Sequence, residues 1–564
     1  MSRWLASLVF LGTLAFFGCF LLWPIAQIVQ GGFIDADGHF TLGYIAAVLA
    51  NPIYRDGLVT SFLLATTTTI LSVALGLPLA YFADRHRFPG RAFFVALILV
   101  PLVLPPFVGA IGLRQIFGQY GAFNALLQHA GLLGAGHTID WLAHGRFWGI
   151  ALVQALNLYP VIYLNAAAAL ANVDPAMEEA AANLGCTGLR RFRRVTLPLM
   201  APGLFAGGTI VFIWAFTELG VPLVFDYGRV APVQVFSLLK EMSGNPAPYA
   251  LVSIMLGATV LFYALSKGVF GRHRYEMMAR ATAAPATRTL PLWRALLVSL
   301  LFAGVLAFAL LPHVGVILVA SSHDWYATLL PTQFTLDNFR LALGHEFTVS
   351  AIRNSLKYAA LATVLDLVLG VAIAWTIVRS RLPGRQVLDA LTMLPLAVPG
   401  LVLAFGFLAM TQEGRAFAFL NPIENPTLLL VIAYSVRRLP YVVRAAAAGF
   451  EQTSITLEEA AQNLGATPWR ATRRITLPLI SANLIAGGLL AFAFAMLEVS
   501  DSIILAQKQA FFPITKAIFE LFQLLGDGKY LASALGVWAM AFLSLTIIAL
   551  GVLLGKKAGA LFRS

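Results

Sequence analysis

The chain has 564 residues, of which 59% are hydrophobic and only 11% are charged. Soluble globular proteins average about 45–50% apolar and about 25% charged residues, so the composition excludes an ordinary soluble domain. The formal net charge of +12 does not predict a nucleic-acid partner, because basic residues beside membrane spans orient a chain in the bilayer. The two cysteines, Cys19 and Cys186, are too few for a disulfide framework.

Apolar runs of roughly twenty residues, enough for a helix to cross about 30 Å of hydrocarbon, recur along the chain. They predict an all-α polytopic membrane protein, since a β-barrel would show alternating segments of about ten residues. The first run is too long for a signal peptide and is expected to be an uncleaved span. The first six predicted spans are 6–29, 58–83, 93–117, 148–171, 203–225 and 249–270. The other six are 293–319, 351–378, 388–411, 427–449, 483–506 and 532–554.

The two sets of spans belong to an internal repeat. The segment EEAAANLGCTGLRRFRRVTLP at 178–198 returns as EEAAQNLGATPWRATRRITLP at 458–478, 280 positions later. Earlier pairs, such as Pro101 with Pro395, are 294 positions apart, so the second repeat is about fourteen residues shorter. An even number of spans per repeat gives both halves one orientation, which predicts a pseudo-twofold axis along the membrane normal.

The repeat also predicts the domain organisation. We expect a first six-span domain at 1–270, a polar linker at 271–292 and a second six-span domain at 293–564. Most basic residues outside the spans fall on one side of the membrane if both termini are cytoplasmic, although Lys508 and Lys529 lie on the other. The predicted location is a bacterial inner membrane, crossed several times, with both termini in the cytoplasm.

The repeated polar segment is predicted to form a helix–turn–helix outside the bilayer. Asp174 is a good N-cap, Pro175 fits the first helical position, and the acids that follow suit the positive end of a helix. Gly185 is placed to end that helix. A connector without a partner is the alternative, but such faithful duplication favours two equivalent docking elements.

Glu-Ala-Ala, then Gly, then Leu-Pro at this spacing resembles the cytoplasmic loop of permease subunits from bacterial ATP-binding-cassette (ABC) importers. The resemblance covers both copies and the twelve-span layout. It implies two tandem six-helix permease domains of the type I importer fold, with coupling helices at about 174–198 and 454–478. Each would seat on one ATPase subunit. The positions that carry over are Glu179, Ala180, Gly185, Pro198, Glu459, Ala460, Gly465 and Pro478. The two domains, separate chains in most such importers, are fused here.

The missing sequence motifs and the family resemblance together indicate which other subunits the chain needs. No Gly-x-x-x-x-Gly-Lys-Ser/Thr phosphate loop occurs, so we expect a non-catalytic subunit, with ATP hydrolysed by two copies of a separate ATPase. We expect no catalytic residue, no cofactor and no metal site in this chain, because its nine histidines are scattered. The resemblance also implies a periplasmic substrate-binding protein that docks on the outer loops.

Several charged residues fall inside predicted spans, where a charge is costly and marks a functional site. Glu218 and Glu498 are 280 positions apart, and Asp501 lies one helical turn after Glu498. They either line or gate a translocation path, or are buried acids bonded to a neighbouring helix or a broken-helix N-terminus. Arg437 and Arg438 either line a path for an anion, or belong to a kinked helix in which they pair with Glu498 or Asp501 or reach an interface. The second interpretation is favoured.

The substrate is the least determined property. Fused permeases with Leu-Tyr-Pro or Arg-Leu-Pro-Tyr before the coupling loop resemble ferric-iron importers, which makes ferric iron the expected substrate. Close relatives of such permeases are similar to importers of 2-aminoethylphosphonate, thiamine or polyamines, so these are the alternative substrates. A secondary transporter driven by an ion gradient is the alternative from another class.

Overall fold

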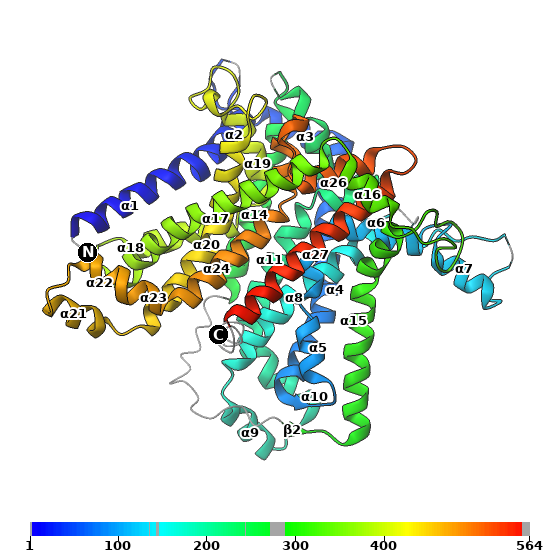
Figure 1. The fold of residues 1–564 in the computed structure, drawn as a ribbon, viewed down its shortest axis with the longest axis horizontal. Helices are drawn as coiled ribbons and strands as arrows, with labels where there is room; N and C mark the ends of the chain where they lie inside the picture. Colours follow the sequence, from blue (N-terminus) through cyan, green and yellow to red (C-terminus); the bar gives the residue numbers. More distant parts are fainter. Residues whose placement is uncertain are drawn as a thin grey trace.

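A computed structural model describes residues 3–35, 37–134, 136–142, 146–242, 244–270 and 288–554 (Figure 1). These residues fold almost entirely into helices. Two short strands among them, β1 (His86–Arg87) and β2 (Arg288–Thr289), pair in parallel. The first seventeen residues of the predicted linker, 271–287, lie outside the described residues. Its last residues form β2 and the start of the next helix, so the second half begins by pairing with the first.

The order of helices along the chain is nearly the same in the first half as in the second half. Those of the first half are α1 (Arg3–Phe17), η1 (Gly18–Leu22), α2 (Trp23–Phe33), α3 (Gly43–Ala50), α4 (Pro52–Arg85), α5 (Arg91–Leu97), η2 (Val100–Val103), α6 (Pro106–Phe117), α7 (Ala122–His129), α8 (Phe147–Ala171), α9 (Pro175–Asn183), α10 (Gly188–Arg191), η3 (Phe192–Thr196), α11 (Leu197–Phe216), α12 (Gly220–Val224), α13 (Ala231–Ser237), η4 (Leu239–Glu241) and α14 (Ala247–Phe270). Those of the second half are α15 (Leu292–Ala320), α16 (Asp337–Gly344), α17 (Thr348–Arg379), α18 (Arg385–Met393), η5 (Leu394–Leu396), α19 (Gly400–Met410), η6 (Ala418–Leu420), α20 (Thr427–Gln452), α21 (Ile455–Asn463), α22 (Pro468–Ala471), η7 (Thr472–Thr476), α23 (Leu477–Leu479), α24 (Ser481–Met496), α25 (Ser500–Leu505), η8 (Gln509–Phe511), α26 (Ile514–Gln523) and α27 (Gly528–Leu554).

Most of the predicted spans are long apolar helices. In the described part of the chain, eight helices are long and apolar enough to cross a membrane, and three bent pairs would raise this number to eleven. The remaining predicted span corresponds to α20, which has 26 residues. Every stretch of 18 residues in α20 contains Arg437, Arg438 and Arg444. The arginines therefore keep α20 out of the apolar set.

Spans three and nine are sharply bent, and the prolines at the bends explain why. The chain turns by 101° between Arg91–Val103 and Pro106–His129, and by 100° between Arg385–Leu396 and Gly400–Met410. Pro105 and Pro399 stand immediately before α6 and α19. Proline lacks the N–H that would continue a helix and disfavours a helical residue before it. The same turn in both repeats is a direct consequence of the repeated prolines.

Spans five and eleven are broken rather than continuous, which corrects the predictions of 203–225 and 483–506. Helix α11 ends at Phe216 and α12 begins at Gly220, whereas α24 ends at Met496 and α25 begins at Ser500. Both runs are uniformly apolar apart from the acids, so hydropathy alone does not reveal the break. Glu218 and Glu498 occupy equivalent positions within the two breaks.

The first helix of each half packs against the other half. Helix α15 lies along α6, and α2 lies along α19. The α6–α15 contact is so close that a Cβ on Gly112 would lie 2.6 Å from the Val316 nitrogen, and one on Gly315 would lie 2.7 Å from the Gly112 oxygen. Gly406 meets Pro24 in the equivalent place, where a Cβ would lie 2.9 Å from the proline Cβ. Glycine thus allows the two halves to interlock through backbone contacts.

Candidate functional site

The two copies of the repeated segment fold alike. Each begins with a nine-residue helix, α9 or α21. The Asp174 carboxylate accepts a hydrogen bond from the Ala176 N–H at 2.9 Å, which confirms the predicted N-cap. In the second copy the Ser454 hydroxyl accepts from the Thr456 N–H at 3.3 Å. Figure 1 shows α9 at the bottom and α21 at the left edge of the molecule, so the two elements project at separate corners.

Gly185 and Gly465 end these helices, as predicted. Their φ values are +78° and +89°, in the left-handed region that favours glycine. The N–H of the following residue, Cys186 or Ala466, donates back to a carbonyl five residues earlier, at 2.9 and 3.0 Å. This is the hydrogen-bond pattern of a Schellman cap. A Cβ would meet nothing within 4 Å at either glycine, so backbone conformation rather than space selects the residue.

All eight predicted docking positions are exposed in the structure. These residues are Glu179, Ala180, Gly185, Pro198, Glu459, Ala460, Gly465 and Pro478. Beside them, the side chains of Leu184 and Leu464 are 88% and 90% exposed. An exposed leucine at the same place in both copies is an apolar contact offered to a partner. We call the two elements at 174–198 and 454–478 the knobs.

A buried anchor that sequence reasoning missed holds each knob to the rest of the chain. Glu178 is buried, accepts a hydrogen bond from the Thr196 hydroxyl at 2.6 Å, and lies 3.3 Å from the Nε atom of Arg85. The same Arg85 donates to the Leu170 carbonyl at the end of α8 at 3.4 Å. The anchor therefore ties together the ends of α4, α8 and α9.

The second knob has the equivalent anchor. Glu458 accepts from the Thr476 hydroxyl at 2.9 Å and lies 3.7 Å from the Nε atom of Arg379, which donates to the Phe450 carbonyl at 2.9 Å. The signal was present in the sequence, because these residues recur at the offsets of 280 and 294 that define the repeat. In each Glu-Glu pair the first acid faces the protein and the second faces solvent, as the 100° step of a helix requires.

Each knob contains a π-helical turn just before the helix that follows. These turns are η3 and η7, each of five residues, and each ends at the threonine that bonds the anchor glutamate. Single π turns are uncommon and often occur at functional sites. From η3 the chain continues through α11 to the break at Glu218, and from η7 it continues through α23 and α24 to the break at Glu498.

The acid in the first break is held by backbone groups. Glu218 Oε1 accepts hydrogen bonds from the N–H groups of Gly220 and Val221, at 3.1 and 3.2 Å. These donors belong to the first turn of α12, so the carboxylate caps a broken-helix N-terminus. Helix α12 packs on α6, and a Cβ on Gly220 would lie 2.9 Å from the Phe107 Cβ.

The second break carries a buried charge cluster. Glu498 forms ion pairs with both Arg437 and Arg438 of α20, and Arg437 Nη1 lies 3.3 Å from Asp501 Oδ2. The side chains of Glu498 and Asp501 are 5% and 0% exposed. The structure thus confirms the interpretation in which the arginines pair with these acids. Whether the cluster gates a path remains a prediction.

Further contacts fix the geometry of this cluster. The hydroxyls of Ser502 and Thr515 each donate to the Glu498 carbonyl at 2.6 Å, and Arg438 donates to the Phe494 carbonyl at 3.2 Å. Sequence reasoning also missed Asp366 of α17, which is fully buried and accepts from the Ser435 hydroxyl at 2.5 Å. An acid in the middle of an apolar helix is a signal that could have identified it.

The first half has neutral residues in place of the two arginines of this cluster. Asn157 and Leu158 stand where the second half has Arg437 and Arg438. The Asn157 amide donates instead to the Pro101 carbonyl at 2.7 Å and to the Leu104 carbonyl at 3.3 Å, at the bend of the third span. The two halves therefore share a framework but differ in the polarity of the core.

Comparison with known proteins agrees with this architecture. The family model described as "Binding-protein-dependent transport system inner membrane component" matches residues 72–276 and 366–557. The chain is 26% identical to the ferric transport system permease protein FbpB of Actinobacillus pleuropneumoniae, over 86% of this chain and 69% of that protein. It is 24% identical to an Fe(3+)-transport system permease protein of Haemophilus influenzae, over 82% of this chain and 83% of that protein.

A shorter relative corresponds to part of the chain. The sulfate transport system permease protein CysT of Salmonella typhimurium is 30% identical over 44% of this chain and 87% of its own length. Since the family model matches twice and together covers more than half of the 564 residues, the chain belongs to the family of inner membrane components of binding-protein-dependent transport systems.

Proposed function

We propose that this chain is the permease of an ATP-driven ABC importer for ferric iron in a bacterial inner membrane. The observation that carries the proposal is the set of ferric-transport permeases that match most of the double-length chain, over 86% and 82% of its residues. Relatives that match only one half include permeases for other substrates, such as sulfate. Ferric iron is the substrate here, not a resident cofactor.

The two knobs are the proposed seats of two ATPase subunits. Each presents an exposed leucine, Leu184 or Leu464, beside an exposed acid, on a nine-residue helix fixed from beneath by a buried ion pair. An apolar side chain in a partner's pocket supplies binding energy, and a rigid mount transmits the partner's movement. The partner subunits would bind and hydrolyse ATP, while this chain forms the path.

Both knobs and both termini are proposed to lie on the cytoplasmic side of the membrane. Arginines surround both knobs, and basic residues accumulate on the cytoplasmic side of membrane proteins. Helix α1 begins beside α18 at the end of the molecule that carries the second knob (Figure 1). A cytoplasmic N-terminus and cytoplasmic knobs are therefore consistent. The opposite end, with the loops around α7 and η8, would receive the periplasmic substrate-binding protein.

The chain offers a direct mechanical link between knobs and breaks. Helix α11 spans about 30 Å, at about 1.5 Å per residue over its 20 residues. It joins the first knob to Glu218, and α24 joins the second knob to Glu498. When ATP brings the two ATPase subunits together, the knobs would approach each other and the helices would move both breaks. The acids at the breaks would then act as the gate.

The charges near the gate do not favour an anionic substrate. The positive charges of Arg437 and Arg438 are balanced by the negative charges of Glu498 and Asp501, and Glu218 adds a further acid.

The experiment that tests the proposed substrate measures uptake by the source bacterium after deletion of the gene. We expect loss of ferric-iron uptake, restored by the wild-type gene, with unchanged uptake of 2-aminoethylphosphonate, thiamine and polyamines. Loss of one of those instead would replace iron as the substrate.

A further inference from the structure

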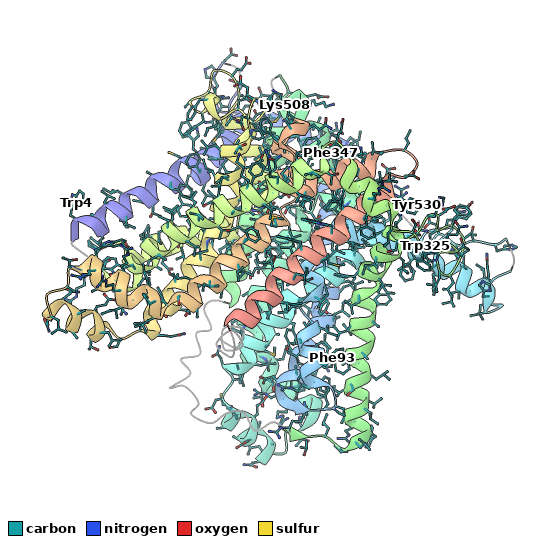
Figure 2. All side chains as sticks on the ribbon, in the orientation of Figure 1. Trp4, Phe93, Trp325, Phe347, Lys508 and Tyr530 are labelled. Carbon is teal, nitrogen blue, oxygen red and sulfur yellow. The ribbon has the colours of Figure 1, made fainter. Side chains whose placement is uncertain are left out.

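A polar cavity of about 490 Å³ lies between the two halves of the chain, beside the segment that leads into α7. Trp325 and Tyr530 mark this region in Figure 2, and the Trp325 N–H donates to the Tyr530 hydroxyl at 3.2 Å. The volume is in the range of sites for small molecules, about 300–1,000 Å³. The polar residues that line it include Arg114, Gln115, Asp140, Arg146, Tyr326 and Lys529.

The lining carries an excess of positive charge. Arg114, Arg146 and Lys529 are cationic, and Asp140 is the acid among the lining residues. Asp226 lies 3.5 Å from Arg146, but its side chain is 87% exposed, so water screens this pair strongly. Asp324 also acts on Lys529, although its carboxylate is engaged by the Tyr530 hydroxyl at 3.0 Å. The cavity thus favours a negatively charged occupant.

The three cations are held in place by protein oxygens although Arg114 repels the other two. Arg146 Nη1 donates to the Asp226 carbonyl at 2.8 Å. Arg114 Nη1 donates to the Val224 carbonyl at 2.9 Å, and Lys529 Nζ donates to Gln115 Oε1 at 3.3 Å. The positive charge of Arg114 interacts unfavourably with both Arg146 and Lys529. A guanidinium carries five N–H donors and an ammonium three, so donors remain for a ligand. An anion among these groups would relieve their repulsion.

The wall of the cavity is built jointly by the two halves. The rings of Tyr120 and Tyr326 stack with centroids 4.9 Å apart, and the Ala327 N–H donates to the Tyr120 carbonyl at 2.9 Å. Arg114 and Arg146 come from the first half, whereas Lys529 comes from the second. A ligand held by all three would connect the halves.

We propose that this cavity binds a small oxyanion, a molecule with a carboxylate or phosphate group, between Arg114, Arg146 and Lys529. Arginine forks suit planar or tetrahedral oxyanions, and lysine adds a point charge. Because the ligand would contact both halves, it would stabilise their association and raise the melting temperature of the chain. The site goes beyond iron transport and requires neither ATP nor a partner protein.

The test is a titration of the purified full chain in lipid nanodiscs with inorganic phosphate and, separately, with citrate. We expect saturable binding of at least one of them and no binding of glycerol, a neutral molecule of similar polarity. Binding of phosphate alone or citrate alone would identify the ligand group. Absence of saturable binding for both probes at millimolar concentration would overturn the proposal.

Substitutions then localise the site. Lys529→Gln and Arg114→Gln are expected to weaken binding at least about tenfold, the loss expected for one charge-assisted hydrogen bond. Arg229→Gln removes an exposed arginine that does not line the cavity and should leave binding unchanged. Asp140→Asn should strengthen binding, a result that misfolding cannot imitate. Equal affinity in all four variants would show that the anion binds elsewhere.

Discussion

Thr196 donates a hydrogen bond to Glu178 at 2.6 Å and so joins the π-helical turn before α11 to the first helix of the knob. Thr476 and Glu458 repeat this bond at 2.9 Å in the second half. Both carboxylates also face an arginine at the end of a long helix. We therefore expect a movement of α9 or α21 to reach the π-helical turn bonded to it, and from there the helix that follows in the chain.

Replacing both anchor acids, Glu178→Gln with Glu458→Gln, should lower the melting temperature of the purified chain. Each change removes a buried charge that faces an arginine, and leaving a buried arginine without its partner costs about 3 kcal/mol or more. Arg379 would lose its partner Glu458, whereas Arg85 would keep Asp84, whose carboxylate lies 3.1 Å from its Nη1 atom, so most of the loss is expected from Glu458→Gln. The matched control is Glu179→Gln with Glu459→Gln, which alters the neighbouring exposed acids and should leave the melting temperature unchanged. Equal melting temperatures for the two double variants would contradict the assigned anchors.

Replacing the glycines that end the knob helices should reduce transport, because their backbone conformation is unfavourable for other residues. Gly185→Ala with Gly465→Ala places a Cβ on residues with φ near +80°, at a cost of about 1–2 kcal/mol each. We expect reduced transport at normal expression, with partial recovery for the asparagine variants, since asparagine tolerates this conformation. Gly304→Ala, in a helix with nothing within 4 Å, is the control. Full transport by the alanine double variant would refute this reason for glycine.

Replacing the acid at one helix break should destabilise the fold more than replacing the acid at the other. Glu498→Gln leaves Arg437 and Arg438 without their shared partner, so we expect loss of about 3–5 kcal/mol of stability and poor assembly, measured by size-exclusion chromatography in detergent. Glu218→Gln removes an acceptor of two backbone N–H groups and should be milder, since the Gln oxygen can still accept.

A second variant tests whether unpaired charge, and not some other effect of Glu498→Gln, causes the poor assembly. Adding Arg437→Asn, Arg438→Leu and Asp501→Val to Glu498→Gln removes every charge of the cluster and gives these three positions the residues that the first half has, Asn157, Leu158 and Val221. Assembly should recover, because the unpaired charges are gone. If Glu498→Gln alone assembles as well as wild type, the cluster does not hold the fold together.

The interlocked halves should assemble without a covalent connection. Helix α15 packs on α6, and α2 packs on α19, through contacts that only glycine allows. Cutting the chain between Phe270 and Arg288 and co-expressing the two parts should give fragments that purify together. Gly112→Leu, which would push a side chain into the Pro312 and Val316 backbone, should separate them. Fragments that never associate would show that the linker is essential for assembly.

Much of the architecture could be predicted from the sequence, because hydrophobic length and repetition are strong signals. Every predicted span corresponds to a helix or a bent or broken helix pair, and the knob helices end at the predicted glycines. Spans five and eleven were predicted as continuous because hydropathy is uniform across Glu218 and Glu498, although a broken-helix N-terminus was among the interpretations left open for these acids. Arg85 and Arg379 were not recognised as anchor residues, because their partners lie more than seventy positions away. The cavity was missed because tertiary packing alone brings Arg114 and Lys529 together.

The most direct test of the account is the rate of ferric-iron uptake by the source bacterium when its only copy of the gene carries Leu184→Glu and Leu464→Glu. Both side chains are about nine-tenths exposed, so the variant should fold and accumulate in the membrane like the wild type. The account predicts that uptake falls to the level of the deletion strain, because neither knob can seat on its ATPase subunit. Uptake at the wild-type rate would contradict the claim that the knobs couple this permease to ATP hydrolysis.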